Sequence, residues 1–119
     1  LYIADDEFKN YSREGIKQIV ECGILAKQES RLVDYLMGKI KSSPLDDRLY
    51  FYLGCTYALK KQMGEAIASF ERSIELNPKE PSAYLNLVGL YRALGKHAMA
   101  QKYEDILIER GRKQRGKND

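Results

Sequence analysis

Apolar residues recur along this chain with the three- and four-residue spacing of an amphipathic helix. The clearest stretch places large and small apolar residues at i, i+3, i+4 and i+7, namely Tyr50, Leu53, Gly54 and Tyr57. The same spacing returns between Ala66 and Ile74, and no run alternates with the period of two that a half-buried strand needs. The pattern predicts an all-α fold with about six helices. The expected helices cover residues 13–27, 30–41, 47–60, 64–76, 81–94 and 98–110.

Residues typical of helix ends stand between these segments. Asp46 follows Pro44 and can cap the helix that begins at 47, while Asn77 and Pro78 end the helix before them. Gly95 can close a helix in the left-handed conformation that other residues adopt at a cost. Helix starts and stops therefore agree with the apolar pattern.

The chain repeats itself with a period of 34 residues. Pro44 and Pro78 are 34 positions apart. The same shift superimposes Tyr50 on Tyr84, Leu53 on Leu87, Tyr57 on Tyr91 and Ala66 on Ala100. Because each period holds two helices, each unit is predicted to be a helical hairpin that buries its apolar face against its neighbours. The predicted organisation is an N-terminal segment (1–12), three hairpins (13–46, 47–80, 81–114) and a basic tail (115–119).

These residues resemble the tetratricopeptide repeat, a family of 34-residue helix-turn-helix units. The second unit carries the pattern at Tyr50, Leu53, Gly54, Tyr57, Ala66, Phe70 and Pro78. The third unit departs at Val88, Glu104 and Arg112, and the first keeps little beyond Pro44 and an apolar stripe. The resemblance implies a right-handed superhelix, an α-solenoid of about three repeats, in which the first helix of each unit lines a concave face.

Register along the repeats then indicates which side chains face the concave groove. Five are expected to anchor a partner: Phe51, Tyr52, Cys55, Leu59 and Leu85. Four are expected to act as polar selectors: Lys17, Arg48, Asn86 and Arg92. Phe51 and Tyr52 stand out because Tyr50, Leu53 and Tyr57 already supply the packed face, which leaves these two rings without a core role. The competing interpretation is that the N-terminal segment, or another domain of the parent chain, covers the groove.

One binding mode known in the family can be tested by residue type. Its clamp on the acidic C-terminus of heat-shock chaperones needs lysine, asparagine and arginine, and the corresponding positions here read Lys17, Glu21, Tyr52, Ser82 and Asn86. Only Lys17 fits, and the charge of Glu21 would repel a carboxylate. A co-chaperone of the carboxylate-clamp type is therefore excluded.

The net positive charge of the chain comes from its C-terminal end. The 20 Lys and Arg residues exceed the 17 Asp and Glu residues by three. Residues 109–119 hold five basic and two acidic side chains, which accounts for the whole excess. The remaining body is neutral and has no field to attract nucleic acid or an anionic membrane, so nucleic acid is not the expected partner.

Composition and motifs give no support to catalysis. At 119 residues the chain has room for one domain, and no apolar run approaches the length of a membrane span. No catalytic, cofactor or metal constellation is present, and two cysteines suit a reducing compartment. We therefore expect a cytoplasmic location, and, because the chain starts at Leu1 and not at methionine, a piece of a larger protein.

The predicted function is a non-enzymatic protein-protein interaction module that binds a peptide or partner segment in its groove. Two alternatives remain open. One is a scaffold that forms homo-oligomers through apolar residues of the last helix, around Tyr103 and Ile106. The other is a regulatory appendage of a larger enzyme or of a nucleic-acid-associated protein.

Overall fold

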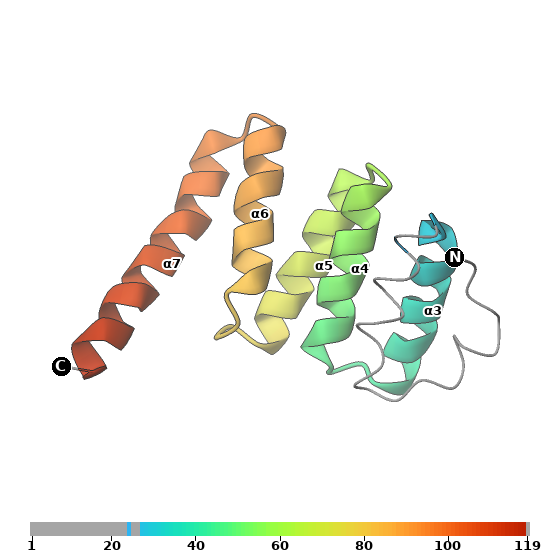
Figure 1. Ribbon diagram of the computed structural model, residues 1–119, viewed down its shortest axis with the longest axis horizontal. Helices are drawn as coiled ribbons and strands as arrows, with labels where there is room; N and C mark the ends of the chain where they lie inside the picture. The colour runs from blue at the N-terminus through green and yellow to red at the C-terminus, as the bar shows by residue number, and fades with distance from the viewer. Residues whose placement is uncertain (1–23, 25–26, 119) are drawn as a thin grey trace.

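The computed structural model describes residue 24 and residues 27–118, and within them it is a row of antiparallel helices (Figure 1). The helices are α3 (Glu29–Ser42), α4 (Asp47–Leu59), α5 (Met63–Leu76), α6 (Ser82–Ala93) and α7 (His97–Asn118). The described part contains no strand. Each helix packs against the next one along the chain, so α3 and α7 lie at opposite ends of the row. The predicted all-α repeat fold is confirmed.

Helix boundaries agree with the sequence prediction except at the C-terminal end. The predicted helices at 30–41, 47–60, 64–76 and 81–94 match α3 to α6 to within one residue at each end. The helix predicted at 98–110 is wrong at its end, because α7 continues to Asn118 through Gly111. A glycine inside a helix costs only about 1 kcal/mol, which the neighbouring contacts of Arg110 described below can offset. The helix predicted at 13–27 falls outside the described residues, apart from residues 24 and 27.

Local interactions place the helix ends where the sequence predicts them. The Asp46 side chain accepts a hydrogen bond from the backbone N–H of Arg48 at 3.1 Å and so caps α4. Gly95 has a positive φ of 76° between α6 and α7. Lys61, which stands 34 residues earlier, has φ 65°, and Lys27, another 34 residues earlier, has φ 57°. The same backbone turn therefore recurs three times at the period of the sequence repeat.

The hydrophobic core has two parts. One lies between α3 and α4 and is formed by Leu32, Val33, Leu36, Leu49 and Leu53. The other joins α5, α6 and α7 and is formed by Ala66, Phe70, Ala83, Leu87, Val88, Tyr91 and Ala100. Tyr57 of α4 packs against both parts, so α4 joins them.

Close approach of α4 and α5 depends on Gly54. A Cβ atom at this position would lie 2.8 Å from two ring atoms of Phe70, and Phe70 is fully buried. Ala66 is also fully buried, and Ala100, its equivalent in the next unit, is 1% exposed. Small residues at these positions let the helices approach closely.

The last helix is held against α6, the first helix of the same hairpin, by aromatic and cationic side chains. Tyr103 stacks on Tyr91 with ring centroids 5.9 Å apart and contacts Tyr84 at 6.0 Å. The Arg110 guanidinium lies 4.7 Å from the ring centroid of Tyr84, donates to the Tyr84 hydroxyl at 2.9 Å, and donates to the backbone carbonyl of Pro78. These contacts hold the second half of α7 against the start of α6.

Candidate partner-binding groove

Two cavities lie between α4 and α6, and together we call them the α4–α6 groove. The first, the polar pocket, has a volume of about 600 Å³. Its lining residues are Asp47, Arg48, Phe51, Tyr52, Ser73, Asn77, Glu80 and Ser82. The second, the apolar pocket, has a volume of about 380 Å³. Its lining residues are Ala58, Leu85, Asn86, Gly89 and Leu90.

Helical periodicity explains why the two pockets share one groove. Phe51 in the polar pocket and Ala58 in the apolar pocket are seven residues apart, which is almost two full turns, so both lie on the same face of α4. Ser82 and Gly89 have the same relation on α6. The pockets therefore follow each other along a strip between two helices, and this arrangement suits an extended chain segment.

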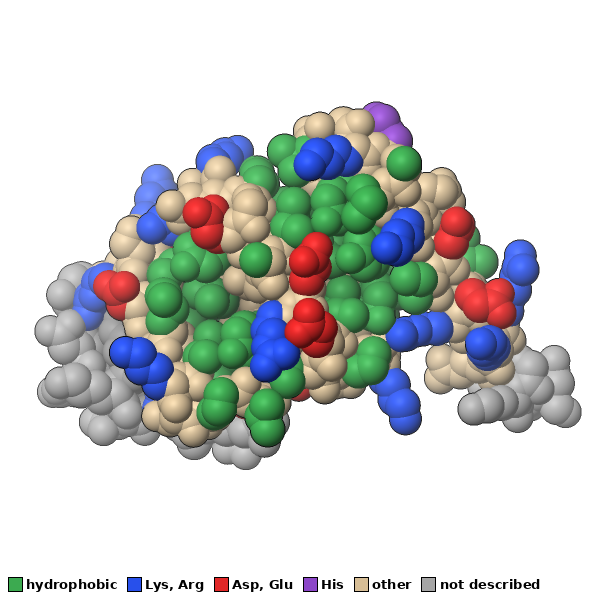
Figure 2. Space-filling model, turned by 180° about the vertical axis from the view of Figure 1, so that it is seen from behind, with side chains coloured by type: hydrophobic (Ala, Val, Ile, Leu, Met, Phe, Trp, Pro, Cys, Tyr) green, Lys and Arg blue, Asp and Glu red, His purple; other side chains and the backbone are tan. Residues whose placement is uncertain are grey.

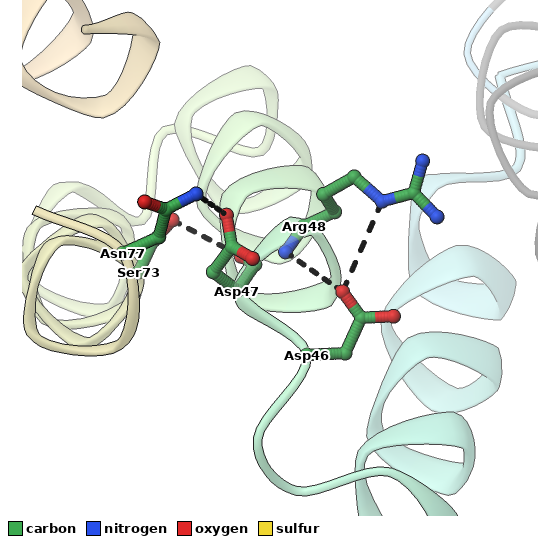
Figure 3. Close-up of polar contacts among 5 residues, drawn as sticks. All are labelled: Asp46, Asp47, Arg48, Ser73 and Asn77. Carbon is green, nitrogen blue, oxygen red and sulfur yellow. Dashed lines mark hydrogen bonds and ion pairs between the residues drawn. The ribbon is translucent and has the colours of Figure 1, made fainter. Parts of the chain in front are cut away.

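Hydrogen bonds between helices fix the polar end of the groove (Figure 3). The Ser73 hydroxyl donates to the backbone carbonyl of Asp47 at 3.0 Å, and the Asn77 amide donates to Oδ2 of Asp47 at 3.3 Å. Asp46 receives the backbone N–H of Arg48, and its Oδ1 is 3.9 Å from Nε of the same arginine. The start of α4 is thus held against the end of α5, with the Arg48 guanidinium on the other side of Asp47.

The two aromatic anchors line the polar pocket but also take part in the core. Phe51 is half-buried and packs on the α5–α7 core, with its ring centroid 5.7 Å from that of Phe70. Tyr52 is half-buried against the α3–α4 core. The expectation that these rings have no core role is wrong. Both side chains therefore take part in core packing and line the polar pocket at the same time.

The predicted anchor Cys55 lies between Phe51 and Ala58 along α4 but lines neither pocket. Cys55 is half-buried and packs on the α5–α7 core one turn after Phe51. Burial raises the pKa of the Cys55 thiol to about 11, and a hydrogen bond with its backbone opposes this only in part. The thiol is therefore protonated and uncharged at neutral pH, which suits packing and not nucleophilic chemistry.

Of the remaining predicted site residues that the structure describes, two line the groove and two do not. Leu85 and Asn86 line the apolar pocket, and Leu85 is 60% exposed. Leu59, at the end of α4, is exposed but lines neither pocket. Arg92 also lines neither pocket, because its guanidinium forms an ion pair with Glu104 of α7. Lys17 lies outside the described residues.

Four lining residues of the polar pocket were missed by register alone. They are Asp47, Ser73, Asn77 and Glu80. All four stand at or near helix ends, where repeat register gives no direction for a side chain. For Ser73, Asn77 and Glu80 the signal available in the sequence was their polar character around Asn77–Pro78, which marks the loop between α5 and α6; Asp47, at the start of α4, had no such signal.

Apolar surface is not restricted to the groove. Seen from behind, hydrophobic side chains gather in two areas, one over α3 to α5 and one over α6 and α7, and charged side chains lie between them (Figure 2). On α7, Ile106 and Leu107 are half-buried and Ile108 is 45% exposed. The last helix therefore carries apolar side chains that the described residues do not cover completely.

Within the described residues, no group of three or more His, Cys, Asp or Glu side chains is placed to hold a metal ion. None of the described helices has the length and apolar character needed to cross a membrane.

Comparison with known proteins identifies the repeats. Two tetratricopeptide-repeat models match the chain, one at residues 48–80 and the other at residues 69–102. No curated protein matches the chain by sequence. The matches overlap and together cover α4, α5, α6 and the start of α7.

Solved structures with similar folds are also helical repeats. Residues 41 to the end of MamA from Desulfovibrio magneticus RS-1 give a TM-score of 0.77 at 21% identity, covering 85% of this chain and 57% of that one. A crystal structure of MamA gives 0.78 at 22% identity, with coverage of 88% and 61%. A CopN–Scc3 complex gives 0.68 at 17% identity, with coverage of 85% and 56%. This chain spans less than two thirds of each, and at such identities the likeness concerns the fold.

Proposed function

Over residues 48–102 this chain belongs to the tetratricopeptide-repeat family, and on that premise we propose that it is a protein-interaction module. It holds an extended segment of a partner protein in the α4–α6 groove. The observation that carries this proposal is the alignment of two cavities, of about 600 and 380 Å³, along a single strip between two helices. An extended segment could place one side chain in each.

The chemistry of the strip supports binding. Leu85 exposes 60% of its surface beside Gly89, where a missing side chain leaves open space. Burying a leucine completely is worth about 1.5–3 kcal/mol, so a partner that covers Leu85 gains a share of that energy. Aromatic rings at the other end, Phe51 and Tyr52, are held by the core and lose little freedom on binding.

The comparisons support a protein as the partner. One similar structure is named as a complex of two proteins, CopN and Scc3. Cys55, the only cysteine among the described residues, is protonated at neutral pH and so suits packing rather than nucleophilic chemistry. We assign the chain no reaction of its own.

Filling the apolar pocket tests the proposal. Gly89→Trp places a large ring in the groove, whereas Gly38→Trp places the same ring on α3, away from it. A Cβ atom at either position meets nothing within 4 Å, so both helices should tolerate the change. Peptides selected from a displayed random library on the wild-type chain should bind Gly89→Trp at least about tenfold more weakly, and bind Gly38→Trp as they bind wild type. Equal binding to all three proteins would contradict the proposal.

Self-association through α7 is the second candidate function. It is favoured by Ile106, Leu107 and Ile108, which remain partly or largely exposed on the last helix. Analytical ultracentrifugation should then show a dimer that Ile108→Glu abolishes. A monomer at all concentrations would remove this candidate and leave the groove proposal unaffected.

A further inference from the structure

The polar pocket carries an excess of negative charge. Three carboxylates, of Asp46, Asp47 and Glu80, stand at or beside its wall with one guanidinium, that of Arg48. Asp46 already pairs with Arg48. Among the residues that the structure describes, neither Asp47 nor Glu80 forms an ion pair. The pocket therefore has two carboxylates whose charge is not neutralised by a neighbouring cation.

Both carboxylates keep the capacity to accept further hydrogen bonds. Asp47 uses Oδ2 to accept one bond from Asn77, and Glu80 uses Oε1 to accept the backbone N–H and the hydroxyl of Ser82. An ionised carboxylate offers about four acceptor sites, so each group retains sites for a donor from outside. A cationic hydrogen-bond donor would both neutralise the carboxylate charge and fill the unused acceptor sites.

Aromatic rings also line this pocket. The rings of Phe51 and Tyr52 meet edge to face, with centroids 5.8 Å apart and an angle of 62°. Their π faces attract cations, and the attraction increases where water is excluded. A cavity of about 600 Å³ with aromatic walls and two carboxylates is complementary to a side chain that is flat, cationic and rich in donors.

We propose that the polar pocket binds an arginine side chain of the partner segment, between Asp47 and Glu80 and against the rings of Phe51 and Tyr52. This inference rests on the proposed function. Arginine fits better than lysine, because a planar guanidinium stacks on rings, donates in parallel to carboxylates and gives up its hydration more easily than an ammonium group. The partner is therefore a basic segment, the opposite of the acidic tail that a carboxylate clamp would hold.

The distance between the pockets sets a spacing for the partner's sequence. Phe51 and Ala58 are seven residues apart on α4, which corresponds to about 10 Å along a helix that rises about 1.5 Å per residue. An extended segment in the polyproline II conformation advances about 3.1 Å per residue and returns to the same face every third residue, so three residues cover that distance with both side chains toward the groove. The partner should carry an apolar residue three positions from its arginine, with the apolar side chain over Leu85.

Charge neutralisation tests the proposal. Asp47→Asn with Glu80→Gln removes both charges with little change of size, and the amide oxygens can still accept the bonds from Asn77 and Ser82. The control, Glu65→Gln with Glu109→Gln, changes the net charge equally at two exposed positions outside both pockets. A displayed random library panned on wild type and on the control should yield peptides with arginine three residues from an apolar residue. Panning on the pocket variant should not.

A matched peptide pair then measures the interaction. Exchanging the arginine of a selected peptide for citrulline, which has the same shape without the charge, should weaken binding to wild type at least about tenfold, the loss typical of one charge-assisted contact. The same exchange should change binding to the pocket variant less than about twofold. Glu80→Gln alone, at an exposed position, gives an intermediate loss and keeps the test valid if the double variant unfolds.

The outcomes separate this inference from the function on which it rests. Selected peptides that lack arginine, or an equal citrulline effect on both proteins, would overturn the arginine assignment while sensitivity to Gly89→Trp kept the groove. Peptides insensitive to Gly89→Trp would overturn both. A dimer lost in the pocket variant would make a second copy's basic tail the occupant. If peptides bind only after deletion of residues 1–12, the occupant of the polar pocket would be the chain's own N-terminal segment. Either result would overturn the assignment to a separate partner.

Discussion

Gly54→Ala should destabilise this chain, although alanine is the better helix former. The added Cβ atom would lie 2.8 Å from Cδ1 and Cε1 of Phe70 and 2.9 Å from Cζ. Ordinary carbon contacts are about 3.5–4.0 Å, so the ring would have to move by about 0.7 Å. Phe70 is fully buried and already contacts the ring of Phe51, which leaves it no free space.

Two opposing energies decide whether Gly54→Ala lowers or raises the stability of the chain. Forcing an extra carbon into a packed core costs about 1–3 kcal/mol, whereas replacing glycine by alanine in a helix gains up to about 1 kcal/mol. The net loss for Gly54→Ala should be about 1–2 kcal/mol. Gly38→Ala is the matched control, because its Cβ atom meets nothing within 4 Å and only the gain remains, about 0.5–1 kcal/mol.

Urea unfolding, monitored by circular dichroism, measures the change in unfolding free energy for both glycine variants. Phe70→Leu should partly relieve the clash, so the double variant Gly54→Ala with Phe70→Leu should lose less stability than the sum of the single variants, by about 1 kcal/mol. If Gly54→Ala and Gly38→Ala stabilise the chain equally, α4 and α5 do not approach as closely as described and the repeat packing argument fails.

Three further predictions concern the turns, the last helix and pH. Lys61→Gly should stabilise the chain by about 0.5–1 kcal/mol in urea unfolding, because Lys61 adopts a φ of 65° that glycine reaches without strain. Arg110→Ala should cost about 1 kcal/mol and lower hydrogen-exchange protection in the second half of α7, because the contact with Tyr84 is lost. Burial is the main reason why the pKa values of Tyr91 and Tyr103 lie above the ordinary value of 10. The native state therefore keeps protons that the unfolded chain releases. Stability should therefore decline as pH rises above about 10, and Tyr103→Phe should make that decline shallower.

Helix periodicity and helix caps were readable in the sequence because both depend on local interactions. Asp46 and Gly95 act where their residue types predict. Lys27 and Lys61 adopt the same left-handed turn as Gly95, but a lysine gives no sign of it. Only the repeat period, applied to the backbone of Gly95, could have indicated those two turns.

The groove was predicted in outline, and its chemistry was not. Register along α4 and α6 located Phe51, Tyr52 and Leu85. It treated core packing and exposure to the groove as alternatives, whereas Phe51 packs on the core and also lines the polar pocket. The pairing of Arg92 with Glu104 crosses from one helix to the next and has no local signal. The carboxylates of the polar pocket stand at helix ends, and only the approach of α4, α5 and the α6 start brings them together.

The most direct test of the groove is a nuclear magnetic resonance titration of the 119-residue chain with a peptide selected on it. Binding in the α4–α6 groove should shift the amide signals of residues 47–58 and 82–90, and leave those of α7 beyond Tyr103 in place. Shifts concentrated on residues 104–118, with the groove amides unchanged, would contradict the account and move the binding surface to the last helix.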